Sequence, residues 1–340
     1  MVQVPRPGKA PTSADVARAA GVSRTTVSFV LNNVPGSGIS EATREKVLAA
    51  VRKLGYSPNA GARALRAGTS NLVLYAMPRW PLGHTIHTLL ERTRDALAER
   101  GLVLIVHGDR NLTGMEAARG WAELRPRAVI ADSCRCTRES VAMLRQHGVH
   151  TVVLVGEEAV PYAPTVVFQQ RRVGGVAAEH LVKEGHRRIA GIVPLGDLSE
   201  AGELRYAGLQ DVADADPSLE LTRVEMPFDH DRALAVARAW AASENRPTAV
   251  FAYNDEFAAL MMRALRDVGL SVPGDVAVVG VDDTPLCELV TPRLTSVALH
   301  STNFAEMHVK VLMEQLDRTL GDEPPVVPEH EPVLVRRDSA

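Results

Sequence analysis

The sequence has few cysteines and no long apolar run. Only 3 of its 340 residues are cysteines, and Cys134 and Cys136 lie too close together for an ordinary bridge and lack the second pair that a zinc site needs. An odd count without paired spacing excludes the disulfide framework of small secreted proteins, so we expect free thiols. No apolar stretch approaches the ~20 residues that span a bilayer, which excludes a membrane-spanning segment.

Signals for export, catalysis and metal binding are also missing. Residues 1–10 are basic, contain prolines and are followed by no apolar stretch, so we interpret them as a flexible arm rather than a signal peptide and expect a cytoplasmic protein. The sequence has no P-loop, no Gly-x-Ser-x-Gly turn and no His-Glu-x-x-His motif. His84 and His87 have helical spacing but no acidic third ligand nearby. We therefore expect neither an enzyme nor a metal ion or cofactor.

Charge is distributed unevenly along the chain. Residues 1–68 contain ten Lys and Arg against three Asp and Glu, a formal charge of +7. The remaining residues contain 28 against 38, a formal charge of −10. A basic segment attached to an acidic one is typical of a phosphate-binding head whose body must not bind DNA.

Residues 12–31 have the pattern of two short helices joined by a turn. Thr12 and Asp15 have the spacing of a capping box, which begins the first helix. A glycine turn leads to Ser23, which can cap a second helix over 24–31. Two helices joined in this way, the second displaying an arginine and short polar groups, are typical of a helix-turn-helix that reads the DNA major groove.

The outward residues of this second helix are the expected DNA contacts. Its valines recur at helical spacing and face inward, which leaves the polar residues outside. The alternative is a small helical bundle whose outward residues are merely solvated, but the basic charge of the segment argues against it. The expected contacts are Ser23, Arg24, Thr25, Thr26, Ser28, Phe29 and Asn32.

A third helix and a short fourth one follow. Ser40 caps a helix that Gly55 ends, and this helix completes a three-helix core. After a break at Pro58, residues 60–67 form an Ala-rich helix of barely two turns, which should fold only when something braces it. Leu65 suits a wedge into the minor groove, although a plain linker helix whose leucine packs on the body fits the local sequence equally well. The expected contacts of this segment are Asn59, Arg63, Leu65 and Arg66.

From Asn71 onward, apolar runs alternate with amphipathic helical stretches. The runs fall into a first series at 72–77, 102–107, 128–131 and 151–155, and a second series at 165–168, 189–193, 221–226, 249–252 and 276–281. Strands that alternate with crossover helices form parallel sheets covered on both faces, so the two series predict two doubly wound lobes. A late strand at 296–299, a helix at 302–320 and a tail rich in Pro and Glu follow, and the pattern alone assigns them to neither sheet.

Polar and aromatic residues follow several of these strands. Ligands of open α/β sheets bind outside the carboxyl ends of the strands. Carboxylates and a guanidinium bind hydroxyls or amides, and an aromatic face stacks on a ring. Each residue alone could be a cap or loop residue, and Asp255 in particular has the place of an N-cap. As a set they predict a site for a polar, ring-shaped molecule if both lobes close on one cleft: Arg79, Asp132, Arg205, Phe228, Asn254 and Asp282.

Motifs along essentially the whole chain closely resemble the lactose-repressor (LacI/GalR) family of bacterial transcription regulators. In the basic segment they are Asp15-Val-Ala, Gly21-Val-Ser, Thr26-Val-Ser28, Thr43-Arg-Glu-Lys-Val47, Gly55-Tyr-Ser-Pro-Asn59 and Ala62-Arg-Ala-Leu65. In the body they include Glu179-His-Leu, Gly185-His-Arg-Arg-Ile189, Arg246-Pro-Thr248, Val278-Val-Gly280, Asp282-Asp283 and Pro292-x-Leu-Thr295.

The resemblance implies a homodimer on a near-palindromic operator, with one reading helix per half-site and an effector between the lobes. Arg24 and Thr25 match base-reading residues, and 59–67 matches a hinge helix that folds on operator DNA and inserts Leu65 into the central base step. The effector contacts that it implies are Arg205 and Asp282 for hydroxyls or ring groups, Phe228 for stacking, and Asn254 and Asp132 as further polar contacts. It also implies that the late strand and helix return to the first lobe.

Three positions depart from the family pattern. Phe29 replaces the Arg or His of many members and cannot make a bidentate guanine contact, so the operator should differ at that step. Gly156 stands where some sugar-responsive members have an acidic contact. Residues 79–83 replace the more usual run after the first strand. The last two departures concern the identity of the effector.

The expected organisation is an all-α helix-turn-helix head with a hinge helix, followed by an α/β core of two lobes like that of periplasmic binding proteins. The expected boundaries are 1–10 for the arm, 11–57 for the head, 58–68 for the hinge helix and 71–340 for the core, with a first lobe of about 71–160 and 292–323 and a second of about 161–291 and 324–340.

The expected function is a dimeric transcription regulator, a repressor, controlled by a sugar-like effector. The alternatives are a solute-binding protein of the periplasmic sugar-receptor type without regulatory role, and a DNA-binding regulator controlled by a protein partner. The missing export signal and the basic head argue against the first of these.

Overall fold

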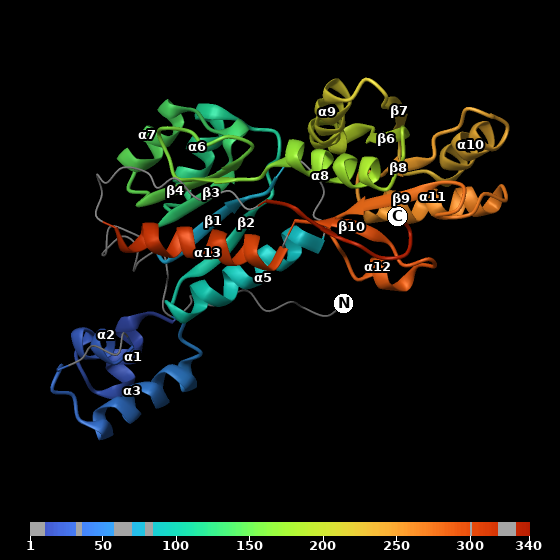
Figure 1. The fold of residues 1–340 in the computed structure, drawn as a ribbon. Helices are drawn as coiled ribbons and strands as arrows, with labels where there is room; N and C mark the ends of the chain where they lie inside the picture. The colour runs from blue at the N-terminus through green and yellow to red at the C-terminus, as the bar shows by residue number, and fades with distance from the viewer. Residues whose placement is uncertain (1–10, 32–35, 58–69, 79–83, 300, 319–330) are drawn as a thin grey trace, which may run out of the picture. The chain divides into compact units, whose positions relative to one another are not determined.

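The chain forms two compact units, Met1–Ser70 and Asn71–Ala340. The structure is a computed structural model, and it describes residues 11–31, 36–57, 70–78, 84–299, 301–318 and 331–340 (Figure 1). The predicted hinge helix over 58–68 therefore lies outside the described residues, as do Asn32, Asn59, Arg63, Leu65, Arg66 and Arg79.

Within its described residues, the first unit contains the helices α1 (Ser13–Ala20), α2 (Arg24–Leu31) and α3 (Glu41–Leu54). The capping box predicted for α1 is present, because the Thr12 side chain accepts a hydrogen bond from the Asp15 amide and the Asp15 carboxylate accepts one from the Thr12 amide. Gly21 and Gly55 end α1 and α3 in left-handed backbone conformations, with φ of 66° and 59°. The helix-turn-helix expected from the sequence is thereby confirmed.

The three helices of the head pack around a small apolar core. Val16, Val27 and Val47, one from each helix, are completely buried at its centre. The side of α2 that carries Val27 is therefore held against the bundle. The opposite side of α2 faces away from this core.

The second unit begins with a five-stranded parallel sheet, ordered β2-β1-β3-β4-β5. Its strands are β1 (Leu72–Ala76), β2 (Val103–His107), β3 (Ala128–Asp132), β4 (Thr151–Gly156) and β5 (Thr165–Val167). Its helices are α5 (His84–Glu99), α6 (Gly114–Glu123) and α7 (Arg138–Gln146), with a short 3-10 helix η1 (Ser133–Arg135). Strands buried on both faces need a helix layer on each side, and α6 and α7 supply one of these layers (Figure 1).

A six-stranded sheet follows, ordered β11-β10-β9-β8-β6-β7, in which β11 alone runs antiparallel to its neighbour. The strands are β6 (Arg188–Pro194), β7 (Glu220–Met226), β8 (Ala249–Phe251), β9 (Ala277–Val281), β10 (Thr295–Ala298) and β11 (Val333–Val335). The helices are α8 (Gln170–Lys183), α9 (Ser199–Ala215), α10 (His230–Ala241), α11 (Asp255–Asp267) and α12 (Leu286–Leu289), with a 3-10 helix η2 (Gly196–Leu198). Helices α8 and α9 cover one face of the sheet, and α10 and α11 cover the other. The two doubly wound lobes predicted from the alternating pattern are confirmed.

Two strands belong to other sheets than expected. Residues 165–168 were expected to open the second series, but β5 pairs with β4 and closes the edge of the first sheet. The late strand was expected in the first lobe, but β10 pairs with β9 in the second sheet. Helix α13 (Ser301–Asp317) then packs against α5 on the first lobe. The chain therefore crosses between the lobes after β5, after β10 and again before β11, because strand pairing rather than order in the sequence decides the sheet.

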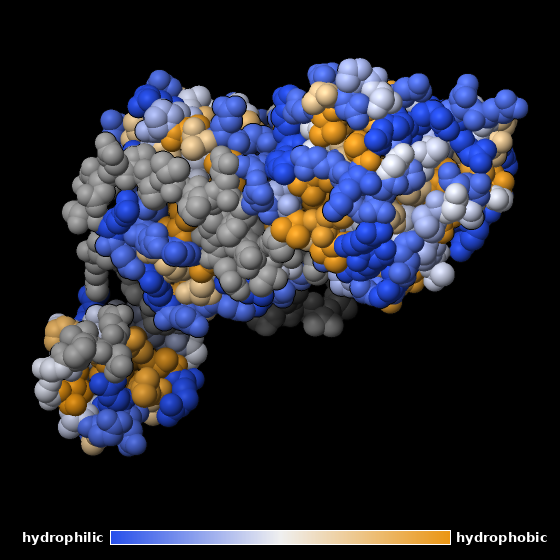
Figure 2. Space-filling view, in the orientation of Figure 1, coloured by the Kyte–Doolittle hydropathy of each residue, from blue (hydrophilic) through white to orange (hydrophobic). Residues whose placement is uncertain are grey.

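The apolar residues of the second unit are mostly internal. Figure 2 shows hydrophilic residues over most of its visible surface, with hydrophobic residues in small patches between them. Across the described ranges, none of the helices combines the length and the apolar character that crossing a membrane requires.

Candidate functional site

Helix α2 presents a polar surface on the side away from the head's core. Arg24, Thr25 and Phe29 are exposed, and Phe29 retains 38% of its accessible surface. Thr25 and Phe29 are four residues apart, so they share one face of the helix. This face carries a guanidinium, a hydroxyl and an aromatic ring, which can reach phosphates, base edges and thymine methyl groups respectively.

Two of the predicted DNA contacts are occupied by local hydrogen bonds. The Ser23 hydroxyl accepts a hydrogen bond from the Thr26 amide at 3.0 Å and lies 2.9 Å from the Thr26 hydroxyl. Ser23 therefore begins α2 as its cap, as the sequence predicted. Ser28 is half-buried beside the exposed face.

We call the predicted effector site of the second unit the core site. Close packing of α8 on α9 positions its arginine, Arg205. A Cβ atom on Gly174 would lie 1.8 Å from the Arg205 carbonyl oxygen, and one on Gly208 would lie 1.9 Å from the Arg171 carbonyl oxygen. Only glycine allows the two backbones to approach so closely. This approach places Gln170, in the first turn of α8, beside Arg205 on α9.

Arg205 is buried, with 4% of its surface exposed, and its guanidinium joins three elements. Its Nε donates to the Gln170 side-chain oxygen at 2.6 Å, and its Nη1 donates to the Tyr253 carbonyl beyond β8. The guanidinium carbon lies 4.5 Å from the centre of the Tyr253 ring, within the range of a cation–π contact. Asp282, which follows β9, places a carboxylate oxygen 3.8 Å from Nη2 of Arg205.

Phe228 and Phe257 form an aromatic corner next to Tyr253. The Phe228 ring follows β7 and is 59% exposed, and it meets Phe257 edge to face with ring centres 5.2 Å apart. Phe257 in turn lies 5.9 Å from Tyr253 in a similar geometry. The structure thus brings Arg205, Phe228 and Asp282 to the carboxyl ends of the strands of the second lobe, where the sequence predicted them.

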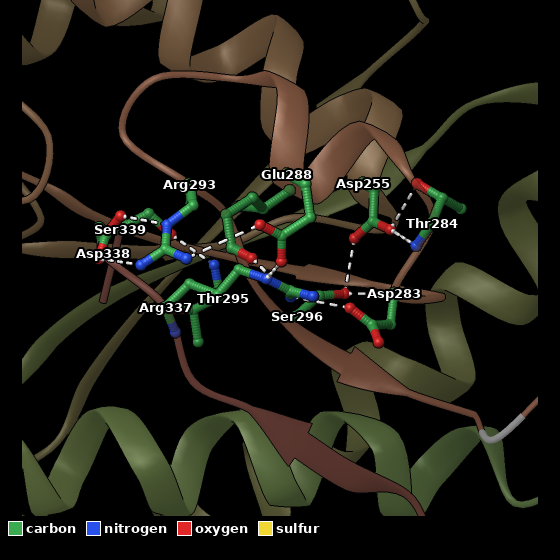
Figure 3. A network of polar contacts seen from close by, with 11 residues as sticks. Asp255, Asp283, Thr284, Glu288, Arg293, Thr295, Ser296, Arg337, Asp338 and Ser339 are labelled. Atoms are coloured by element: carbon green, nitrogen blue, oxygen red, sulfur yellow. Dashed lines mark hydrogen bonds and ion pairs between the residues drawn. The ribbon is translucent and has the colours of Figure 1, made fainter.

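Asn254 and Asp255 have roles that differ from the simplest sequence interpretation. The Asn254 side-chain oxygen accepts from the Phe257 amide at 3.0 Å and caps α11, so the expected N-cap role of Asp255 is wrong. Asp255 is 1% exposed and accepts hydrogen bonds from the Thr284 amide and hydroxyl and from the Ser296 hydroxyl at 2.6–2.9 Å (Figure 3). Burial raises the pKa of Asp255, and these hydrogen bonds oppose the rise.

In the first lobe, Asp132 ends β3 with 4% exposure and lies near a buried arginine that the sequence did not single out. Arg135 is completely buried and donates to the carbonyl oxygens of Met77 at 2.8 Å and Leu112 at 3.0–3.1 Å. Its guanidinium also lies 5.2 Å from the Trp121 ring centre. Arg135 therefore holds the segments that leave β1 and β2 at the carboxyl edge of the first sheet.

Glu157 links the first lobe to the second. It follows β4, and its two carboxylate oxygens lie 3.1 and 3.2 Å from the Gln170 amide nitrogen at the start of α8. Burial raises the pKa of Glu157 to about 7, against the hydrogen bonds from the Gln170 and Arg171 amides, which lower it. Glu157, Gln170 and Arg205 thus form a continuous chain of contacts. No sequence pattern indicated this chain of contacts, because a glutamate after a strand and a glutamine in a first turn are common loop and helix residues.

A DNA-reading head and a two-lobed core with polar residues at its strand ends define a DNA-binding regulator with a ligand-binding body. Residues 12–59 match the model of bacterial regulatory proteins of the lacI family, and residues 178–340 match that of the periplasmic binding protein-like domain. The HTH-type transcriptional repressor PurR of Vibrio parahaemolyticus is 30% identical over 312 residues, which cover 90% of this chain and 92% of that protein. The chain therefore belongs to the LacI family of transcription regulators, and the resemblance inferred from its motifs is confirmed.

Solved structures agree with this assignment. The lac repressor dimer bound to operator and the anti-inducer ONPF has a TM-score of 0.76 at 25% identity, over 97% of this chain and 99% of that one. The complex of the transcriptional regulator CelR with cellobiose has a TM-score of 0.62 at 28% identity, over 97% of this chain and 100% of that one. The relatives named here are transcriptional regulators rather than enzymes.

Proposed function

We propose that the protein is a repressor that binds a palindromic operator as a homodimer and is controlled by a sugar-like molecule at the core site. The observation that carries the effector class is the 3.8 Å separation of Arg205 and Asp282. This distance is too long for a direct hydrogen bond. A ligand hydroxyl between the two groups can accept from the guanidinium and donate to the carboxylate.

The surroundings of this pair support a ring-shaped ligand. The exposed Phe228 ring offers a stacking face on the same edge of the sheet, and Asp132 and Asn254 are the further polar contacts that we propose. Arg205 is already held by Gln170 and Tyr253, so the ligand need not order it on binding, which favours affinity. The cellobiose complex of CelR is consistent with a carbohydrate ligand.

The head supplies the DNA-binding half of the proposal. Arg24 and Thr25 on the exposed face of α2 are the proposed base-reading residues, one set for each half-site of the operator. We retain residues 11–57 as the DNA-binding domain, 58–68 as a hinge helix that folds on operator DNA, and Leu65 as its minor-groove wedge. A regulator of chromosomal operators would act in the cytoplasm.

Control by the effector requires two states with different ligand affinity. In the mechanism that we propose, the ligand changes the relative angle of the two first lobes across the dimer. That angle determines whether the two short hinge helices can pack together on the operator. The lac repressor dimer solved on its operator is consistent with this dimeric arrangement.

The test separates operator binding from effector response. Operator sequences are first selected from random duplexes, and the binding of the protein to them is measured by fluorescence anisotropy. Calorimetry then measures whether the protein binds cellobiose, ribose, glucose, adenosine or guanosine. Arg205→Ala should keep operator affinity within ~2-fold but reduce the affinity for the bound probe at least ~10-fold, because a hydrogen bond to a charged group contributes about 1.5–3 kcal/mol. Arg187→Ala, at an exposed arginine of the same lobe, is the matched control.

Three outcomes would contradict parts of the proposal. A normal ligand response of Arg205→Ala would make the site assignment wrong. A protein that binds sugars but prefers no duplex would be a solute-binding protein. Operator binding that no sugar or nucleoside affects would favour control by a protein partner.

A further inference from the structure

We propose that Arg337 is a positioning residue of the effector site, because its ion pair with Asp283 holds the turn that directs Asp282 toward Arg205. The inference rests on the proposed function only in treating Asp282 as a ligand contact. Arg337 comes from the C-terminal segment, 55 residues away from Asp282 in the sequence. No motif identified in the sequence connects the two.

The turn after β9 has an unusual backbone. Asp282 and Asp283 have φ of 98° and 47°, so two consecutive non-glycine residues occupy the left-handed region. Besides Arg125, they are the non-glycine residues of the described chain with positive φ. Such conformations persist only where the surroundings determine them strongly, and they are frequent at ligand sites.

Hydrogen bonds from its backbone amides tie the turn to the neighbouring strand β10. The Asp282 amide donates to the Val297 carbonyl at 3.0 Å, and the Asp283 amide donates to the Ser296 hydroxyl at 3.1 Å. The Ser296 hydroxyl donates in turn to the buried Asp255 carboxylate at 2.6 Å. These contacts place the backbone but provide no positive charge for the three neighbouring carboxylates of Asp255, Asp282 and Asp283.

Arg337 places a positive charge beside Asp283, whereas Arg205 lies near Asp282. In Figure 3 its guanidinium lies between the carboxylates of Asp283 and Glu288. Its Nη1 is 2.8 Å from Asp283 and its Nε is 2.6 Å from Glu288, and its side chain is only 12% exposed. Nη1 also donates to the Leu294 carbonyl at 3.1 Å. Because this cation is poorly solvated and its geometry is constrained by several acceptors, its attraction for Asp283 should be stronger than that of a surface pair.

Arg336 is a natural control for Arg337. Its side chain is 62% exposed and pairs with Glu184 at 2.9 Å rather than with a residue of the turn. Successive residues of an extended segment point to opposite sides. The two arginines therefore share type and sequence context but differ in whether they reach Asp283.

The experiment compares Arg337→Gln, Arg337→Lys, Asp283→Asn and Arg336→Gln in the full chain. Asn tolerates the left-handed backbone, so Asp283→Asn removes the charge without adding backbone strain. For the probe that wild type binds among cellobiose, ribose and adenosine, we expect Arg337→Gln and Asp283→Asn each to weaken binding about 10-fold, and their combination to weaken it little further. Arg337→Lys should recover part of the affinity, and Arg336→Gln should stay within ~2-fold of wild type.

A second readout requires no ligand. Crystal structures of wild type and Arg337→Gln should show that Asp282 leaves its left-handed conformation and moves away from Arg205 in the variant only, while operator affinity without ligand is unchanged. An unchanged Asp282 conformation in Arg337→Gln overturns the inference, and so does an equal loss of affinity in Arg336→Gln. If Arg337→Gln does not fold, the structure and affinity of Asp283→Asn decide in its place. If no probe binds wild type, the proposed effector class fails while the crystal structures still decide the role of Arg337.

Discussion

Protonation of the Glu157 carboxylate should change the stability of the core. Its folded-state pKa of about 7 lies above the ordinary value of 4.5 because burial disfavours the charged form. Between these two values the folded protein binds more protons than the unfolded chain. The contribution of Glu157 to stability is therefore present below about pH 4.5 and is lost as the pH rises through about 7.

Glu157→Gln should remove this dependence while keeping an oxygen that can accept from the Gln170 amide. In urea unfolding at pH 5 and pH 8, the variant should lose less stability than wild type over the same interval. Glu158→Gln, at the exposed neighbouring residue, is the control and should follow wild type. Parallel pH profiles of wild type and Glu157→Gln would show that the carboxyl does not titrate in this interval.

The placements that the sequence predicted correctly are those that depend on near neighbours. Thr12 and Asp15 cap the same turn, and Asp282 directly follows a strand that the apolar pattern marked. Gln170 and Arg337 act on residues 35 and 54 positions away, and nothing in their local sequence reports that contact. The role of a residue that acts through tertiary contacts can be assigned only once the order of the strands in the sheets is known.

At the scale of elements, the contact between α8 and α9 determines the geometry of the core site. A Cβ atom added to Gly208 would lie 1.9 Å from the Arg171 carbonyl oxygen. This oxygen belongs to the backbone, so no side-chain movement can relieve the clash. Gly208→Ala must therefore separate the two helices. Because Gln170 and Arg205 are on opposite helices, their 2.6 Å hydrogen bond should lengthen as well.

We expect Gly208→Ala to lower the free energy of unfolding by about 1–3 kcal/mol, the usual cost of overpacking, and to weaken ligand binding. Gly120→Ala is the matched control, since a Cβ on this glycine of α6 meets nothing within 4 Å. There the gain in helix propensity should stabilise the protein by about 0.5–1 kcal/mol. Urea unfolding of both variants measures the contrast, and a neutral Gly208→Ala would contradict the packing argument.

Sheet membership was the part of the fold that the sequence pattern could not give. Strands β5 and β10 have the same short apolar character as their neighbours, so periodicity identifies them as strands without naming their partners. The pairing of β5 with β4 and of β10 with β9 depends on where the chain crosses between the lobes. Those crossings are also the places where a change in lobe angle must be accommodated.

At the scale of the whole molecule, the proposed dimer requires a surface on the first lobe. Strand β2 is an edge strand of its sheet, and Val103 and Val106 on it are 48% and 39% exposed. An edge strand with exposed valines can pair with another chain, and lysine on an edge is a common means of preventing such contacts. A second copy of this chain is the partner that a two-half-site operator requires.

Val106→Lys should therefore weaken both self-association and operator binding. We expect the dimer dissociation constant to rise at least ~10-fold, because a charge would be buried in the proposed contact without a partner. Operator affinity should fall in parallel and be restored at high protein concentration, since each head still binds its own half-site. Leu124→Lys, at a leucine of 41% exposure after α6, controls for the added charge. Sedimentation and anisotropy on the same samples measure both quantities, and a dimeric Val106→Lys with wild-type operator affinity would place the interface elsewhere.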